Sequence, residues 1–589
     1  MPNTDIVIEI CGSAGEGTIS SGEIFNRYIS SIGFEIMSFD TYPSEIRGFG
    51  KCVAHSRFST QKIYTPGKYT DILIALNDAH SISQLGTLKD TGVVIYDSKP
   101  PKYHEEDKSI VGWMEPGMIT YGVPFNDLAQ KAAGNSRGRN MVALGAVCAL
   151  FNVDHEDFKS TIIQRYSKKK QIVIDSNVNS FVEGFNWAND NLTKIDSISF
   201  KKMKKKKKSA TSIIINGNQA VAKAAIDSDL HLFAGYPITP ATKIMEILSK
   251  ELPKKNGIML QTEDEISAIG NVLGAGFAGK RSMTATSGPG FALMTEFMGI
   301  SVMAEVPAVI LNSQRGGPST GLPTKTEQSD FNAAVSGGTG DLPRFVIAPA
   351  SVEECYEGTV LAFYLAEKYQ TLAIILLDFF LSNSIRNIEE PSKPDAKMLD
   401  ANLEPTEREL KDYIRFKDTK TGVSPRSKPG TPNGMYTTTG LEHNERGKPQ
   451  YDGALHIKMS DMRYRKMESA LKDIPKPKWT GPKKDIDIGI LAWGSSAGAA
   501  YEAAEIAKKK GYKVAVLSSL VVYPVNKAVL TKFSEASKQI LIPELNYSGQ
   551  YANFIASYIQ RPAERLNMIS GLPMASEDIL AKIEEMIGQ

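Results

Sequence analysis

Four short motifs lie between residues 232 and 318, and each follows a run of apolar residues that is typical of a β-strand. The motifs are Tyr236-Pro237-Ile238-Thr239-Pro240, Glu263-Asp264-Glu265-Ile266, Thr286-Ser287-Gly288-Pro289-Gly290 and Gln314-Arg315-Gly316-Gly317-Pro318. In an open α/β sheet the loops at the carboxyl ends of the strands face one crevice, so we expect a hydroxyl, a carboxylate, a glycine turn and an arginine to meet there. These groups suit a small anionic substrate bound beside a cofactor.

Two features expected of a complete site of this kind are missing from the sequence. The chain contains no Gly-Asp-Gly motif, which would bind a metal ion with a diphosphate. Its four cysteines, Cys11, Cys52, Cys148 and Cys355, are too scattered for a disulfide framework, a CxxC metal site or a cluster. We therefore predict that the cysteines are reduced thiols and that this chain holds no metal site. We also predict that it contributes only half of an active site.

Length and composition limit the class of protein. A chain of 589 residues exceeds what one hydrophobic core fills, so about three or four domains are expected. With 42% hydrophobic and 23% charged residues the chain is expected to be globular. A formal net charge of +2 provides no general basic field, which argues against nucleic acid as the main partner.

The sequence favours a cytoplasmic protein that does not enter a membrane. The first apolar run is not preceded by a basic region, which argues against secretion. The longest apolar stretch, residues 371–381, contains Asp378 and is shorter than the roughly 18 to 20 residues that cross a bilayer.

Strand and helix patterns divide the chain into five parts. Residues 1–197 are predicted to form an α/β domain with a parallel sheet, because strand-like runs at 6–10, 72–76 and 93–96 alternate with helical ones. Residues 198–211 contain seven lysines and are interpreted as a solvated linker, with a docking patch for an acidic partner as the alternative. Residues 212–384 form a second α/β domain that contains the four motifs.

The remainder is predicted to be an arm and a third domain. Residues 385–484 are rich in Pro, Lys, Asp and Gly and have little periodicity, so we expect an ordered arm without strong secondary structure. Tyr413, Tyr436, Tyr451 and Tyr464 are its expected anchors. Residues 485–589 again alternate strands with helices and are predicted to form an α/β domain.

Thr239 and the acidic run each have a purely structural alternative. Thr239 before Pro240 is typical of a helix start, but the full pentapeptide is rarer than a cap requires, which favours a binding role. Acids at 263–265 would stabilise the first turn of a helix by roughly 0.3 to 1 kcal/mol. That effect explains the charge of these residues but not their position at the end of a strand. A carboxylate at that position would accept a hydrogen bond from a heterocyclic nitrogen.

The two remaining motifs of the second domain have alternatives of the same kind. The glycines around Pro289 permit close backbone approach to a ligand, although any tight turn uses them. Arg315 would pair bidentately with a carboxylate, whereas a surface arginine is usually only solvated.

A glycine-rich turn also follows the first strand of the chain. Gly12, Gly15 and Gly17 lie between a strand and a helix, where backbone amides bind phosphate. Their spacing is GxxGxG rather than the dinucleotide GxGxxG. Arg47 and Arg57 add positive charge to the same domain, although solvated surface arginines are the default interpretation.

Taken together, these motifs resemble the alpha subunits of 2-oxoacid:ferredoxin oxidoreductases, in the form that has a gamma domain fused ahead of the alpha domain. The resemblance covers nearly the whole chain. Its most specific markers are residues 235–240, 263–266, 284–290 and 314–324, in matching order and spacing. Residues 12–17, 45–48 and 140–141 look like the gamma domain, and residues from about 485 look like the transketolase C-terminal domain.

The resemblance implies an α/β multidomain fold with a pyrimidine-type thiamine diphosphate domain. It also implies oxidative decarboxylation of a 2-oxoacid, most closely 2-oxoglutarate, by coenzyme A, with electrons passed to ferredoxin. Thiamine diphosphate would be shared with a beta subunit that carries Mg²⁺ and a [4Fe-4S] cluster, in an alpha-beta or (alpha-beta)₂ assembly.

Site residues are implied by the same match. Thr239, Arg315, Thr324 and Tyr236 would bind the substrate, and Glu265 would activate the cofactor ring, with Glu263 as second choice. The expected cofactor-binding residues are Pro237, Ile238, Glu265, Ser287 and Gly288 for thiamine diphosphate, and Gly12, Gly15, Gly17 and Arg47 for coenzyme A.

Other functions remain open on the sequence. The chain would alternatively belong to a pyruvate-type or broad-specificity enzyme, or to a non-redox thiamine diphosphate enzyme, in which case its partner would lack cluster cysteines. A catalytically inactive scaffolding subunit is the third alternative, but retention of Thr239, Glu265 and Arg315 argues against it.

Overall fold

The computed structural model describes residues 4–42, 50–100, 109–200 and 212–588. The chain divides into two compact units: residues 1–214 with 384–390, and residues 215–383 with 391–589. The lysine-rich segment 201–208 and Arg47 lie outside the described residues. The division of the chain into five parts stays a prediction.

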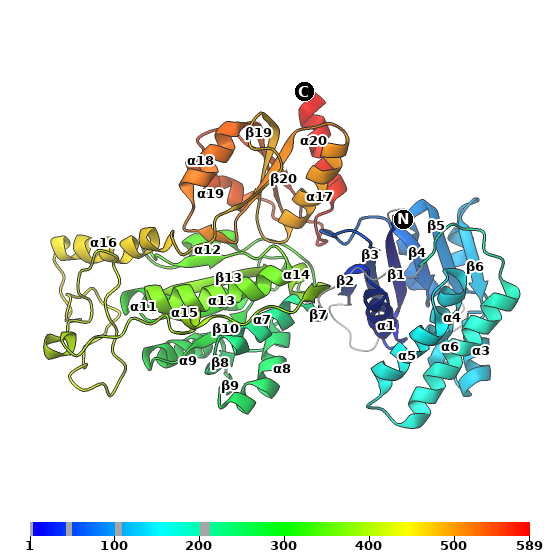
Figure 1. Cartoon of the computed structure of the whole chain (residues 1–589), viewed down its shortest axis with the longest axis horizontal. Helices are drawn as coiled ribbons and strands as arrows, with labels where there is room; N and C mark the ends of the chain where they lie inside the picture. Colours follow the sequence, from blue (N-terminus) through cyan, green and yellow to red (C-terminus); the bar gives the residue numbers. More distant parts are fainter. Residues whose placement is uncertain (1–3, 43–49, 101–108, 201–211, 589) are drawn as a thin grey trace. The chain divides into compact units, whose positions relative to one another are not determined.

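The first unit is built on an eight-stranded sheet in the order β6-β5-β4-β1-β3-β2-β14-β7 (Figure 1). Its strands are β1 (Asp5–Ser13), β2 (Glu35–Thr41), β3 (Lys51–Ser59), β4 (Thr70–Ala75), β5 (Leu88–Asp97), β6 (Ile119–Val123), β7 (Ser212–Asn216) and β14 (Ile385–Glu389). The prediction of a parallel sheet is only partly right. β1, β4, β5 and β6 are parallel, but β3 is antiparallel to β1 and β2, and β14 is antiparallel to β2. The link from β2 to β3 is too short for the crossover of a dozen or more residues that parallel pairing needs.

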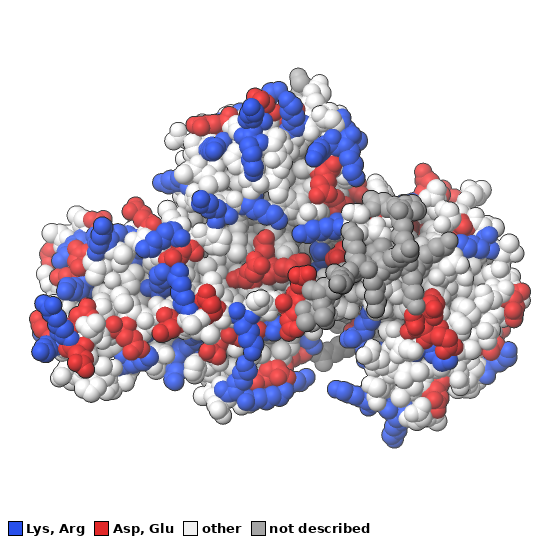
Figure 2. Space-filling view, viewed as in Figure 1, with Lys and Arg blue, Asp and Glu red and all other residues white. Residues whose placement is uncertain are grey.

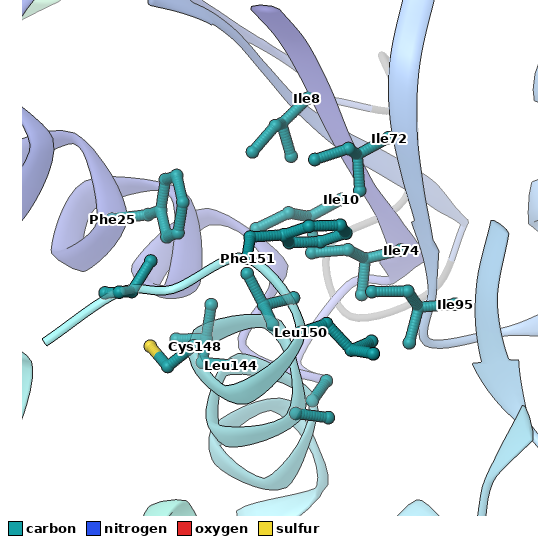
Figure 3. Packing of buried hydrophobic residues seen from close by; sticks show 14 of the residues in the cluster. Ile8, Ile10, Phe25, Ile72, Ile74, Ile95, Leu144, Cys148, Leu150 and Phe151 are labelled. Atoms are coloured by element: carbon teal, nitrogen blue, oxygen red, sulfur yellow. The ribbon is translucent and has the colours of Figure 1, made fainter. Parts of the chain in front are cut away.

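Helices cover this sheet and bury a continuous apolar core. They are α1 (Thr18–Ser31), α2 (Asp78–Ser81), α3 (Phe125–Ala133), α4 (Arg139–Leu150), α5 (His155–Tyr166) and α6 (Gln171–Asn191). Figure 3 shows isoleucines of β1, β4 and β5 facing Phe25, Leu144 and Phe151. α4 is buried almost all round, and α6 packs closely on it because a Cβ at Gly145 would lie 2.2 Å from the Phe181 carbonyl oxygen.

The second unit contains a seven-stranded sheet in the order β18-β12-β13-β11-β10-β8-β9. Its strands are β8 (Leu232–Gly235), β9 (Ile258–Gln261), β10 (Ser282–Thr286), β11 (Ala308–Gln314), β12 (Phe345–Ile347), β13 (Leu372–Asp378) and β18 (Val521–Tyr523). All neighbours pair in parallel except β18, which is antiparallel to β12. Its helices are α7 (Gly217–Asp227), α8 (Thr242–Glu251), α9 (Glu265–Phe277), α10 (Gly288–Leu293), α11 (Thr295–Met303), α12 (Phe331–Ser336), α13 (Val352–Tyr369) and α14 (Phe379–Asn383).

The second unit also contains a five-stranded sheet in the order β15-β17-β16-β19-β20. Its elements are β15 (Lys478–Thr480), β16 (Ile486–Ala492), α17 (Ser496–Lys509), β17 (Val514–Ser518), α18 (Lys527–Ala536), β19 (Ser537–Glu544), α19 (Gln550–Ile559), β20 (Glu564–Asn567) and α20 (Ser576–Gly588). We call residues 485–589 the C-terminal domain. Residues of this domain and of the seven-stranded sheet share one apolar cluster, which includes Ile310, Phe331, Trp493 and Ile542.

The segment predicted to be an irregular arm contains more regular structure than expected. Residues 385–389 form β14, α15 spans Ala396–Leu399, and α16 spans Gly453–Ala470 (Figure 1). The pattern of α16 was hidden because its buried face includes Arg463 and Lys466 beside methionines. Most of residues 400–452 lacks helices and strands, as expected.

The arm is anchored by only two of its four tyrosines and by buried charge. The Tyr413 hydroxyl donates to the Pro425 carbonyl oxygen at 2.9 Å, and the Tyr436 ring packs 5.8 Å from Phe277. Tyr451 is 78% exposed and Tyr464 is 38% exposed, so these two do not serve as buried anchors.

A buried ion pair also holds the arm. Nζ of Lys466 in α16 lies 2.7 Å from Oε2 of Glu305, and both side chains are almost fully buried. Arg415 donates to the Glu305 carbonyl oxygen at 2.9 Å. Burial lowers the pKa of Lys466 to about 8, opposed by the attraction of Glu305.

Elsewhere the charged side chains are interspersed on the face drawn in Figure 2, with no continuous field of one sign.

Candidate active site

The four motifs follow four neighbouring strands of the seven-stranded sheet. β11, β10, β8 and β9 are adjacent and parallel, and the motifs come at or directly after their carboxyl ends. Because these ends lie at one edge of the sheet, the motifs share that edge.

Arg315 and Thr239 are brought into direct contact there. Nη1 of Arg315 donates to the Thr239 carbonyl oxygen at 2.8 Å. Arg315 is 7% exposed, and its Nε has no partner in the described part of the chain. Thr239 does not cap the following helix, because α8 has Ala241 at its N-cap. The capping alternative for Thr239 is therefore wrong, and its carbonyl is used to hold the arginine.

The structure separates the three acids of the second motif. Asp264 is the N-cap of α9, where its Oδ1 accepts a hydrogen bond from the Ser267 amide at 2.7 Å. Glu263 is exposed, whereas Glu265 is 6% exposed. Among the described residues the Glu265 carboxylate has no hydrogen bond or ion pair. Glu265 is thus the acid that is buried and still able to receive a donor.

The glycine turn after β10 faces this carboxylate. A Cβ at Gly290 would lie 2.3 Å from Oε1 of Glu265 and 2.2 Å from Oγ1 of Thr286, so only glycine permits this approach. Ser287 is fully buried, and its hydroxyl has no partner in the described residues. The turn therefore lies close to Glu265 and adds a buried hydroxyl that has no partner in the described residues.

Asp330 also lies at this site, although the sequence did not single it out. Its Oδ2 accepts a hydrogen bond from Nδ2 of Asn312 at 3.1 Å, and a Cβ at Gly288 would lie 2.9 Å from the same oxygen. Burial raises the pKa of Asp330, while Asn312 and the charge of Arg315 oppose that rise. Burial shifts the pKa of Arg315 in the opposite direction, to a lower value, because it disfavours the charged guanidinium. Asp330 follows no strand, so no pattern in the sequence marks it.

The remaining predicted substrate and cofactor residues lie at the rim. Tyr236 is 42% exposed, Pro237 is exposed, and Ile238 is half-buried. Thr324 is half-buried in the loop that returns toward Gly316, where the Gly316 amide donates to the Lys325 carbonyl oxygen at 3.1 Å. No hydrogen bond joins Tyr236 or Thr324 to Arg315 within the described residues.

The glycine turn of the first unit is already occupied by a carboxylate. The Ser13 amide donates to Oε2 of Glu16 at 2.6 Å, and Oε1 of Glu16 pairs with Arg139 at 3.3 Å. Gly15 and Gly17 have positive φ values of 93° and 80°, which favour glycine. A phosphate at the Ser13 amide would have to displace Glu16, and the assignment of Gly12, Gly15 and Gly17 to coenzyme A stays a prediction.

Neither a metal-binding group nor a membrane-spanning helix is found among the described residues. No group of three or more His, Cys, Asp or Glu side chains is arranged to hold a metal ion. No helix combines the length and the apolar character that a membrane span requires. The assignment of Mg²⁺ and the cluster to a partner stays a prediction.

Comparison with protein families gives three matches that together extend over most of the chain. Residues 7–187 match the model described as pyruvate ferredoxin/flavodoxin oxidoreductase. Residues 223–462 match the thiamine diphosphate-binding model of pyruvate flavodoxin/ferredoxin oxidoreductase, and residues 486–579 match core domain II of pyruvate:ferredoxin oxidoreductase. These matches confirm the predicted α/β multidomain fold, in which a thiamine diphosphate domain lies in sequence between a gamma domain and a transketolase-like C-terminal domain.

Full-length relatives point the same way. The 2-oxoglutarate oxidoreductase subunit KorA of Mycobacterium tuberculosis is 30% identical over 98% of this chain and 90% of its own. The 2-oxoacid:ferredoxin oxidoreductase subunit alpha of a Sulfolobus species is 30% identical over 93% and 92%. A solved structure of the 2-oxoglutarate:ferredoxin oxidoreductase of Magnetococcus marinus, with 2-oxoglutarate, coenzyme A and succinyl-CoA bound, is 36% identical over 99% of both chains, with a TM-score of 0.92. The chain therefore belongs to the family of 2-oxoacid:ferredoxin oxidoreductase alpha subunits, in the form with a fused N-terminal gamma domain.

Proposed function

We propose that this chain is the alpha subunit of a 2-oxoglutarate:ferredoxin oxidoreductase, which converts 2-oxoglutarate and coenzyme A to succinyl-CoA and carbon dioxide and passes two electrons to ferredoxin. We place it in the cytoplasm. The observation that carries the proposal is the arrangement of Arg315, Thr239 and Glu265 at one edge of the sheet.

Arg315 has the properties of a receptor for the carboxylate next to the keto group. Its guanidinium is buried, one nitrogen is fixed by the Thr239 carbonyl, and another has no partner in the described residues. A planar guanidinium binds a carboxylate with two parallel hydrogen bonds, which orients the substrate as well as holding it. Tyr236 and Thr324 at the rim would complete the pocket.

Glu265 and the glycine turn fit the ring of thiamine diphosphate. Glu265 is buried and open to a donor, glycine at 290 lets the turn approach its carboxylate closely, and the Ser287 hydroxyl has no partner in the described residues. When bound, thiamine diphosphate stabilises the carbanion that forms as the substrate loses carbon dioxide. Glu265 would hold a hydrogen bond to a ring nitrogen, with Pro237 and Ile238 lying against the ring.

An uncovered edge supports a partner subunit. β9 is the outermost strand of the seven-stranded sheet, and Ile258 on it is 61% exposed. Beside it, an open hollow of about 710 Å³ is lined by Glu263, Ile266 and Phe297 among others. An apolar edge strand is a site for pairing or coverage by another chain. A beta subunit that brings the diphosphate-bound Mg²⁺ and a [4Fe-4S] cluster would lie here, in an alpha-beta or (alpha-beta)₂ assembly.

The identity of the 2-oxoacid is the most specific part of the proposal. Relatives named for 2-oxoglutarate support that acid. A broad-specificity enzyme is the second candidate, because full-length relatives such as that of Sulfolobus are named for 2-oxoacids in general.

Co-expression with the partner subunit tests the function. The purified complex should reduce ferredoxin only when coenzyme A and a 2-oxoacid are both present, with kcat/KM higher for 2-oxoglutarate than for pyruvate. Equal efficiency on both acids would favour the broad-specificity enzyme. Coenzyme A-independent turnover would exclude the proposed reaction.

A further inference from the structure

One short segment connects the site to the C-terminal domain. Residues 326–332, which we call the tether, begin after the loop that follows Arg315 and end in the first turn of α12. The tether includes Gln328, Ser329, Asp330 and Phe331. An inference about its role rests on the proposed function.

Gln328 binds the C-terminal domain with both its side chain and its backbone. Its Oε1 accepts from the Leu545 amide at 3.0 Å, and its Nε2 donates to the Trp493 carbonyl oxygen at 2.9 Å. Its own amide donates to the Leu545 carbonyl oxygen at 2.6 Å. Nδ2 of Asn546 donates to the Gln328 carbonyl oxygen at 3.0 Å. Gln328 is fully buried, so these groups depend on one another.

The receiving turn of the C-terminal domain is itself held in place. Glu544 is fully buried, and its carboxylate accepts from the Tyr551 and Ala552 amides at 2.8 and 2.9 Å. Oδ1 of Asn546 accepts from the Gly549 amide at 2.7 Å. The turn from 544 to 552 is therefore internally braced, and it presents Leu545 in a defined position.

Neighbours of Gln328 add a second and a third attachment. The ring of Phe331 lies 5.0 Å from Trp493 and 5.4 Å from Tyr551. Nε2 of Gln550 donates to the Ser329 carbonyl oxygen at 2.7 Å, and Oε1 of Gln550 accepts from the Asn332 amide at 2.8 Å. The tether is thus attached to the C-terminal domain along its length.

The other side of the tether contacts the site. The Ser329 hydroxyl donates to the Arg315 carbonyl oxygen at 3.1 Å. The Asp330 amide donates to Oε1 of Gln314 at 3.0 Å, and the Asp330 carboxylate accepts a hydrogen bond from the side-chain amide of Asn312. The tether therefore touches the C-terminal domain through Gln328, Phe331 and Asn332, the substrate edge through Asp330, and both through Ser329.

We propose that the C-terminal domain positions Arg315 and Asp330 for the 2-oxoacid through this tether, and that Gln328 is the positioning residue at its centre. A purely architectural glutamine would change only stability. A positioning glutamine changes the KM for the 2-oxoacid and leaves the KM for coenzyme A unaffected, because coenzyme A does not depend on Arg315.

Three variants, each in the complex with the partner subunit, test this. Gln328→Leu removes both side-chain hydrogen bonds, and Gln328→Glu keeps the acceptor for Leu545 but loses the donor to Trp493. Gln550→Leu removes the hydrogen bonds of Gln550 to Ser329 and Asn332. It replaces Gln328→Leu in the test if that variant does not fold. The matched control is Gln539→Leu in the same domain, where the side chain of the exposed Gln539 donates to the Met586 carbonyl oxygen at 3.4 Å.

We expect Gln328→Leu to raise the KM for 2-oxoglutarate by about tenfold or more, since buried groups lose their partners, and Gln328→Glu and Gln550→Leu to raise it less. The KM for coenzyme A should stay unchanged in all three variants, and the Gln539→Leu enzyme should match wild type. An unchanged 2-oxoglutarate KM in folded Gln328 and Gln550 variants, or an equal rise for coenzyme A, would overturn the positioning role. A wild-type complex that turns over no 2-oxoacid would instead overturn the proposed function.

Discussion

At the scale of single residues, burial separates two glutamates that the sequence left as first and second choice. Glu265 is buried beside Gly290, and Glu263 is exposed on the rim. We expect Glu265→Gln to lower kcat of the complex by about 10² to 10⁴, the usual size of a lost acid-base contribution, with little change in thermal stability. Glu263→Gln is the control and should be near normal. The reverse result would move the assignment by two residues.

Arg315 gives a second prediction at this scale. Removing one partner of a buried charge pair typically loses about 2 to 5 kcal/mol, so Arg315→Ala should depress kcat/KM for 2-oxoglutarate and pyruvate by similar, large factors. The common factor follows if Arg315 binds the carboxylate next to the keto group, which both acids have. Steady-state kinetics on both acids measures it. A loss confined to 2-oxoglutarate would place Arg315 at the distal carboxylate.

Asp378 at the end of β13 predicts a pH dependence of stability. Its side chain is buried, its Oδ1 accepts from the Leu381 amide at 2.8 Å, and burial raises its pKa to about 6. Because the folded-state pKa exceeds the unfolded value of 3.8, the stability from this group is present below about pH 4 and is lost as pH rises through 6. Asp378→Asn should therefore have a higher thermal midpoint than wild type at pH 7 and a similar one at pH 4. Parallel profiles from pH 4 to 8 would contradict this.

At the scale of elements, α16 is held to the body by a buried ion pair. Lys466→Met leaves Glu305 buried without its closest cation, which typically destabilises by about 3 to 5 kcal/mol. We expect protease to cleave within residues 391–470 much faster in this variant than in wild type. Lys458→Met is the control, because Lys458 pairs with Glu445 on the surface, where the loss is at most about 1 kcal/mol. Equal cleavage of both variants would show that the ion pair does not fasten the arm.

The elements also explain what the sequence could and could not predict. β8, β10 and β11 end where apolar runs meet glycine or proline, so their motifs were placed correctly. The direction of β3 depends on which strands it pairs with, and α16 buries charged side chains that break the apolar pattern. Asp330 reaches the site only because the tether folds back onto β11, a contact between distant parts of the chain that no local pattern records.

At the scale of the whole molecule, the four cysteines are buried and free, and no metal-binding group is present among the described residues. We expect the chain purified alone to be colourless and inactive, and co-expression with its partner to restore both colour and turnover. Visible absorption spectra and iron content of the two preparations measure this. Iron-sulfur absorbance in the isolated chain would contradict the division of labour between subunits.

β18 has a consequence for how the chain matures on the ribosome. This strand comes from the C-terminal domain, yet it covers the outer edge of β12 in the seven-stranded sheet. About 170 residues separate the two strands, so at roughly 5 to 20 residues per second the edge of β12 stays open for about 10 to 35 seconds of synthesis. During that interval the nascent chain exposes an unpaired strand next to a nearly complete apolar sheet, which makes it a substrate for chaperones until residue 523 has emerged.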